Sequence, residues 1–266
     1  MSRGLEHRRR LNAGRSVRDG VRALPRLWAG AWGVLLFATL LGLASPWAPG
    51  GFGGVAYGAA LGLTALAAWG ALCRISAGKT PEGSRRLGLR PGGIQFDMLE
   101  LRIVFAAFLN LLFLSMILAT LALVTLAVFG IAELNVAAIQ ARDWANAGPA
   151  WKLVMLAAVG LIAISVPLLL SVRLALFSQA TTGRGHTVSL NTMGVATGSF
   201  WPLFAVIVLS VTPLIALAAL CLSGFGGLCN PLGLAIVLPW IQAPWAAAVL
   251  GAAYDQIEYW KPAQTG

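Results

Sequence analysis

The sequence has little charge. Only 11% of its 266 residues are Asp, Glu, Lys or Arg, whereas a typical soluble domain has about 25%. A soluble fold of this length needs a charged surface, so the composition argues against one. The chain is instead 58% hydrophobic, and several apolar runs reach the roughly 20 residues that a helix needs to cross a bilayer. We therefore predict an all-α, polytopic integral membrane protein.

Residues that commonly form catalytic centres are also scarce. The two histidines, His7 and His186, have no cysteine, aspartate or second histidine at metal-ligand spacing. Neither the phosphate-binding pattern GxxxxGK[ST] nor the dinucleotide-binding pattern GxGxxG occurs. No ionisable residue falls in the middle of an apolar run, which argues against a proton-coupled pump. We accordingly predict no enzyme activity, no cofactor and no metal site.

The positive charge, a formal +10, is concentrated in residues 1–26 and 74–102. Nucleic-acid binding would need aromatic residues interleaved with these charges, and the arginine-rich head has none before Trp28. The distribution is instead typical of the positive-inside rule, which keeps Lys and Arg on the cytoplasmic side. Only Arg142 and Lys152 then fall outside.

Six spans with both termini cytoplasmic fit this distribution, and the predicted location is the bacterial inner (plasma) membrane. The predicted spans are 27–44, 54–73, 103–129, 153–171, 200–222 and 232–254. The domain organisation is a basic cytoplasmic N-terminal segment (1–26), a six-helix transmembrane domain (27–254) and a short cytoplasmic tail (255–266).

The N-terminal segment is predicted to contain an amphipathic helix from Ser16, with Asp19 completing a capping box. Three arginines of this helix share one face, which can lie on an anionic leaflet. A fourth follows Gly183 in a predicted cytoplasmic turn. The candidate contacts for lipid headgroups are Arg18, Arg22, Arg26 and Arg184. The alternative is that the arginines only fix orientation, and that the turn is a solvated loop.

Three glycines in the second span, Gly54, Gly58 and Gly62, follow one another at four-residue steps. Small residues at this spacing let two helix backbones approach closely. We predict a packing face within the monomer; a homodimer seam is the alternative.

Two carboxylates precede the third span. Asp97 and Glu100 are three residues apart and would be neighbours on a helix, but no nucleophile or metal-ligand set accompanies them. They also suit the positive end of a helix dipole, with Arg102 close by. Arg173, at the inner end of span four, could pair with Glu100 or Asp97 and fix how spans three and four meet. The candidate ion-pair network is Asp97, Glu100, Arg102 and Arg173.

Two amides are candidates for lining a cavity. Asn110 is the deepest strongly polar residue of span three, and Gln242 lies between Pro239 and Pro244. The two prolines must interrupt the helix, and a broken helix can line a cavity. A hydrogen bond between helices is the alternative for Gln242.

Two of the three cysteines, Cys221 and Cys229, bracket a short uncharged turn that the topology places outside. An oxidising compartment permits a disulfide there; two free cysteines are the alternative. Cys73, at the inner end of span two, is predicted to stay reduced.

The connection between spans four and five carries a family resemblance. Arg173-Leu174-x-Leu176, a run of small residues, a Gly-Arg turn and Thr197-Gly198-Ser199-Phe200-Trp201 resemble a motif of bacterial six-span proteins. These are grouped with the membrane domain of glycerophosphoryl diester phosphodiesterases and its uncharacterised relatives. GGIQFDMLELR (92–102) and Ala253-Tyr254 also resemble their segments. The chain departs from the motif at Gln179, where proline is common, and at Thr192-Met193, which replace Ser-Trp.

The resemblance implies six spans and no catalytic role, because the diesterase chemistry belongs to a separate soluble domain. We predict a non-enzymatic membrane protein of structural or accessory type that contacts anionic lipids. The alternative is a small carrier or channel for an uncharged solute or lipid, lined by Asn110 and Gln242. The predicted partners are the lipid bilayer and anionic lipids, and nucleic acid is not among them.

Overall fold

The computed structural model describes residues 11–258 except 49, 133–134, 145, 147, 189–198 and 224–228. All regular elements in this part of the chain are helical, and there is no strand in it. Five helices are long and apolar enough to cross a membrane, or six if a bent pair counts as one span. These findings confirm a helical, multi-span architecture.

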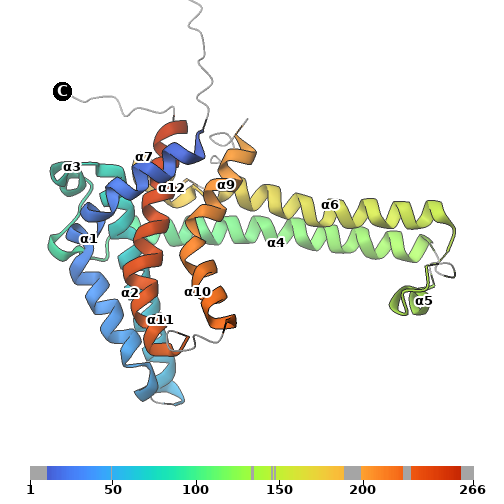
Figure 1. The fold of residues 1–266 in the computed structure, drawn as a ribbon, viewed down its shortest axis with the longest axis horizontal. Helices are drawn as coiled ribbons and strands as arrows, with labels where there is room; N and C mark the ends of the chain where they lie inside the picture. Colours follow the sequence, from blue (N-terminus) through green and yellow to red (C-terminus); the bar gives the residue numbers. More distant parts are fainter. Residues whose placement is uncertain are drawn as a thin grey trace, which may run out of the picture.

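The main body of the molecule is a bundle of helices at one end of its long axis (Figure 1). It contains α1 (Ala13–Leu43), α2 (Phe52–Gly78) and α12 (Ala243–Ile257), which continues α11 (Pro231–Val237) through a π-helical turn at Leu238–Gln242. One buried apolar cluster joins α1, α2 and α12. A second joins α12 to α7 (Phe177–Arg184) and α9 (Phe200–Ser210). Helix α12 therefore contributes to both parts of the core.

Helix α1 begins three residues before the predicted start at Ser16. Asn12 is its N-cap, and the Asn12 side chain accepts a hydrogen bond from the Arg15 backbone N–H. Ser16 is buried and its hydroxyl accepts a hydrogen bond from Gln256 Nε2 at 2.9 Å. The first turn of α1 is thus held by α12 as well as by its own cap.

The first half of α1 runs across the end of the bundle before the helix turns along it (Figure 1). It crosses α12 at Gly20, which has no side chain to keep the helices apart. A Cβ atom added at Gly20 would lie 3.2 Å from the backbone nitrogen of Val249 and 3.3 Å from its Cα. The close crossing therefore depends on glycine at this position.

Helices α4 (Met98–Ala132) and α6 (Ala150–Leu174) form a long hairpin, which we call the arm, with α5 (Val136–Gln140) at its tip. The arm extends sideways from the bundle rather than alongside it (Figure 1). Beyond its base it offers large exposed apolar side chains, among them Leu111, Met116, Leu123, Leu161 and Ile164. Helices of this composition suit a lipid environment and not water.

The predicted spans three and four are the two helices of the arm. The sequence could not predict their direction relative to the bundle, because an apolar run predicts that a helix forms but not how that helix is oriented. Helix α4 follows a non-helical segment at 94–97, and α6 is followed by a turn at residues 175 and 176. Both helices are thus joined to the bundle through breaks in the helical backbone.

The prediction that the glycine row of span two packs within the monomer is wrong. A Cβ atom added at Gly58 or Gly62 would have no neighbour within 4 Å, and both residues are exposed. Helix α2 packs through its second half instead, where Ala68, Leu72 and Ile75 are buried. The row lies in the first half, beyond that contact.

One pair of helices, α9 and α10, is bent near a proline, and the helix 231–257 passes its prolines through a π-helical turn without a break. Tryptophans satisfy the backbone carbonyls at both places. Proline lacks the N–H that would bond the carbonyl four residues earlier. Pro213, in α10 (Thr212–Leu222), frees the Leu209 carbonyl, which accepts a hydrogen bond from Trp245 Nε1 at 2.8 Å. In the same way, the Trp240 carbonyl that precedes Pro244 by four residues accepts from Trp28 Nε1 at 2.9 Å. The 50° bend between α9 and α10 is therefore supported by α12.

Candidate functional site

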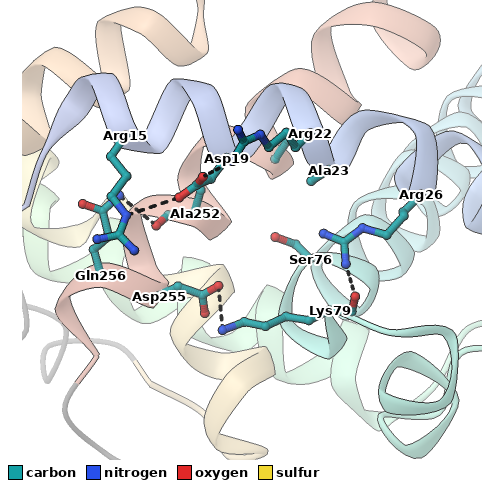
Figure 2. Close-up of a pocket in the computed structure, with 11 residues that line it drawn as sticks. Arg15, Asp19, Arg22, Ala23, Arg26, Ser76, Lys79, Ala252, Asp255 and Gln256 are labelled. Carbon is teal, nitrogen blue, oxygen red and sulfur yellow. Dashed lines mark hydrogen bonds and ion pairs between the residues drawn. The ribbon is translucent and has the colours of Figure 1, made fainter.

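A cavity of about 720 Å³ with a polar lining lies where α1 crosses the ends of α2 and α12 (Figure 2). We call it the basic cavity. Its lining residues are Arg15, Asp19, Arg22, Ala23, Arg26, Ser76, Lys79, Ala248, Ala252, Asp255 and Gln256.

Helical spacing brings the three arginines of α1 to the cavity. Arg15, Arg22 and Arg26 are separated by seven and four residues, and residues at these steps lie on one face of a helix. Lys79 is the C-cap of α2 in a left-handed conformation (φ 57°), and its side chain points toward Asp255 of α12 (Figure 2). Three helices that are distant in sequence thus supply the charges.

Each acidic residue of the cavity forms an ion pair with one or two basic residues. The Asp19 carboxylate lies 3.5 Å from Arg15 Nε and 3.9 Å from Arg22 Nη1, and Lys79 Nζ lies 3.1 Å from Asp255. Arg26 donates a hydrogen bond to the Lys79 carbonyl.

These pairs are open to solvent. The side chains of Arg15, Arg22 and Lys79 are 71%, 73% and 61% exposed to solvent. Exposed ion pairs of this kind contribute about 0–1 kcal/mol, so a ligand can replace them at little cost. With four basic side chains against two carboxylates, the lining favours an anion. Guanidinium groups bind phosphate with two parallel N–H donors.

The structure separates the four arginines that were predicted to contact headgroups. Arg22 and Arg26 line the basic cavity. Arg18 is exposed on the same helix but does not line it. Sequence reasoning missed Arg15 and Lys79. Arg15 could have been found, because it lies seven residues before Arg22 on the same helical face.

Arg184 is not a free headgroup contact. Its guanidinium bonds both carboxylate oxygens of Glu258, at 3.0 and 3.1 Å, and the two side chains are only 7% and 12% exposed. Gly183 lies against the ring of Tyr254 and so brings the Gly-Arg turn to the end of α12. The predicted role is corrected: Arg184 joins α7 to the end of α12.

The predicted partner of Glu100 is also wrong. Glu100 pairs with Arg74, whose two terminal nitrogens bond its two carboxylate oxygens, and both side chains are almost completely buried. Arg74 Nε donates to the Leu87 carbonyl at 3.0 Å. Glu100 also accepts from the Asp97 backbone N–H at 2.8 Å, so it caps the start of α4.

The other members of the predicted network do not join this pair. Arg102 donates to the Gly185 carbonyl, and the side chain of Asp97 is exposed. Arg173 Nε is buried without a hydrogen-bond partner among the described residues. No ion pair joins Arg173 to Glu100 or Asp97 among the ion pairs of the described residues.

The two amides lie inside the protein but do not line the basic cavity. Gln242 Nε2 donates to the Ser210 carbonyl at 3.0 Å, the hydrogen bond between helices that was the alternative to a cavity. Gln242 Oε1 and both side-chain atoms of Asn110 are buried without a partner in the described part of the chain. Asn110 continues the buried row of α4 that includes Ile103 and Ala106.

Cys221 and Cys229 form a disulfide, with Cα atoms 5.7 Å apart. It ties the end of α10 to the segment before α11. Cys73 is a free, buried thiol.

Several predicted features lie outside the described residues. They include His7, the basic head before residue 11, and the motif residues Thr192, Met193, Thr197 and Gly198.

No family model, curated protein or solved structure matches this chain.

Proposed function

We propose that this protein is a non-enzymatic, structural or accessory protein of the bacterial inner membrane that binds anionic lipid headgroups in its basic cavity. We further propose six spans, with α9 and α10 together forming one of them, and both termini in the cytoplasm. We also propose that the chain is related to the membrane domain of glycerophosphoryl diester phosphodiesterases.

The position of the charges supports this topology. The basic cavity lies where the carboxyl ends of α2 and α12 meet the first half of α1, so its cations share one end of the bundle. Positive residues gathered at one boundary are typical of the cytoplasmic side. For α4 and α6 to cross the same bilayer as the bundle, the arm must turn at its base. The non-helical segment 94–97 and the turn after Leu174 are where this rotation would occur.

The single observation that carries the proposal is the basic cavity itself. It has four cations, three of them in exposed ion pairs, directly beside helices whose apolar faces suit a membrane. Anionic lipids attract basic residues near the membrane surface by about 1 kcal/mol for each Lys or Arg. A cavity adds to this attraction a fixed arrangement of donors.

Lipid retention in native mass spectrometry tests the proposal. The detergent-purified protein is expected to retain phosphatidylglycerol in preference to phosphatidylcholine. The double variant Arg15→Gln, Arg22→Gln should weaken phosphatidylglycerol binding about tenfold or more, because two cations of the cavity are removed. Gel filtration and circular dichroism verify that each variant remains folded.

The matched control is Arg18→Gln with Arg86→Gln, two exposed arginines that do not line the cavity. This variant loses the same charge and is expected to bind nearly as well as the wild type. Equal losses in the two double variants would mean that net charge, and not the cavity, attracts the lipid. No preference for phosphatidylglycerol in the wild type would refute the proposed function.

A further inference from the structure

A second cavity, of about 310 Å³, adjoins the basic cavity. We call it the adjoining cavity. It lies between α1, the end of α2, α3 (Pro81–Arg86) and residues 89–92. Arg26 and Lys79 line both cavities, and the hydrogen bond from Arg26 to the Lys79 carbonyl lies at their junction. The two cavities therefore form neighbouring compartments of one basic region.

The adjoining cavity has cations but no carboxylate in its lining. Its basic side chains are Arg26, Lys79, Arg85 and Arg90. Arg85 and Arg90 are exposed and make no ion pair with any described residue. An anion in the basic cavity would leave these two arginines uncompensated. A second anionic group would pair with them.

Part of the lining of the adjoining cavity is apolar, and we call this part its floor. Gly30, Ile75 and Leu89 line it, and a Cβ atom added at Gly30 would lie only 2.7 Å from Ile75 Cδ1. At its rim, Gly92 lies beside Trp32, a half-exposed indole of α1. Tryptophans at such positions are typical of the boundary between headgroups and acyl chains. A ligand with an acyl chain suits this floor better than a free phosphate does.

We propose that the two cavities together bind one lipid whose headgroup carries two phosphates, one phosphate in each cavity. This inference rests on the proposed function and specifies its ligand. Arg26 and Lys79, at the junction, contact both phosphates, while Arg15 and Arg22 hold one and Arg85 and Arg90 hold the other. A lipid with a single phosphate fills one cavity only. Basic pockets between membrane helices are known sites for cardiolipin, whose headgroup has this chemistry.

Competition between lipids tests the inference. The intact protein in nanodiscs of phosphatidylcholine is titrated with cardiolipin or with phosphatidylglycerol, and bound lipid is counted by native mass spectrometry. Cardiolipin is expected to bind about tenfold more tightly or better, since two more arginines contact it. Equal affinity for the two lipids, with phosphatidylcholine weaker, would overturn the two-phosphate inference and leave the proposed function standing. Equal binding of all three would refute both.

Substitutions show which cavity binds the second phosphate. The variant Arg85→Gln, Arg90→Gln should lower cardiolipin affinity to the level of phosphatidylglycerol and leave phosphatidylglycerol binding unchanged. The control Arg86→Gln, Arg18→Gln removes the same charge outside both cavities and should keep the preference. A preference for cardiolipin that survives in the Arg85, Arg90 variant, or is lost equally in the control, would contradict the assignment.

Glycerol 1,3-bisphosphate, which has the two phosphates of the cardiolipin headgroup at the same spacing, tests whether the acyl chains contribute to binding. It carries two phosphate groups without acyl chains, so it is expected to displace cardiolipin only at large excess. Displacement at equal concentration would show that the apolar floor contributes nothing, and the assignment to a lipid would then be wrong.

Discussion

Replacing Glu100 with glutamine is expected to destabilise the protein by about 3–5 kcal/mol, because removing one partner of a buried ion pair leaves the other charge buried and unpaired. Arg74 and Glu100 are 1% and 0% exposed, so water cannot compensate Arg74. The change also weakens the acceptor for the Asp97 N–H at the start of α4. We expect the base of the arm to loosen first, since this pair joins α2 to α4.

Thermal unfolding in detergent measures the effect, and Asp97→Asn is the matched control. Asp97 is exposed, and its hydrogen bonds with Glu100 come from its backbone N–H and carbonyl, so this substitution of its side chain should change the unfolding temperature little. The double variant Arg74→Met, Glu100→Met should recover much of the loss, because apolar pairs of similar volume can replace a buried ion pair. A Glu100→Gln protein as stable as the wild type would mean that the pair does not hold the arm.

Replacing Gly20 with leucine is expected to cost about 1–3 kcal/mol or more, because a side chain forced into a tight contact displaces the backbone. The Val249 atoms facing Gly20 include backbone nitrogen and Cα, which cannot move without moving α12. Since the crossing also forms one side of the basic cavity, retention of phosphatidylglycerol should fall with stability.

Gly62→Leu provides the same substitution without the contact. Gly62 is exposed on α2 with nothing within 4 Å of an added Cβ. Unfolding and lipid retention are measured for both variants. If Gly62→Leu lowers stability as much as Gly20→Leu, the α1–α12 crossing is not the sensitive contact, and the glycine row of α2 packs against something, such as a second copy of the chain.

The length of the apolar runs was sufficient to predict the long helices, because a bilayer-spanning helix needs a run of known length. The disulfide and the hydrogen bond of Gln242 were each one of two alternatives that local chemistry left open. Neither could be decided from the sequence, since both depend on the approach of two helices.

Errors in helix ends account for the missed contacts. Span two was predicted to end at Cys73, but α2 continues to Gly78. This extension places Arg74 inside a packed helix rather than in a basic connection, and so gives Glu100 a partner that sequence reasoning did not consider. It also brings Lys79 to the basic cavity. The sequence does not predict the direction of the arm, because both of its helices are apolar on every side and no face is marked for packing.

The sidedness of the basic cavity is the claim on which the lipid proposals depend, and labelling of single cysteines tests it directly. Arg15→Cys lies in the cavity and Gln140→Cys lies at the tip of the arm. The native cysteines give little background, since Cys73 is buried and the other two are bonded.

A membrane-impermeant maleimide is applied to right-side-out and to inverted membrane vesicles. We expect Arg15→Cys to react only in inverted vesicles and Gln140→Cys only in right-side-out ones, because the cavity faces the cytoplasm and the arm crosses the bilayer. Labelling of both positions from the cytoplasmic side would mean that the arm does not cross. Labelling of Arg15→Cys from the outside would contradict the account, because the basic cavity would then face away from the cytoplasmic leaflet.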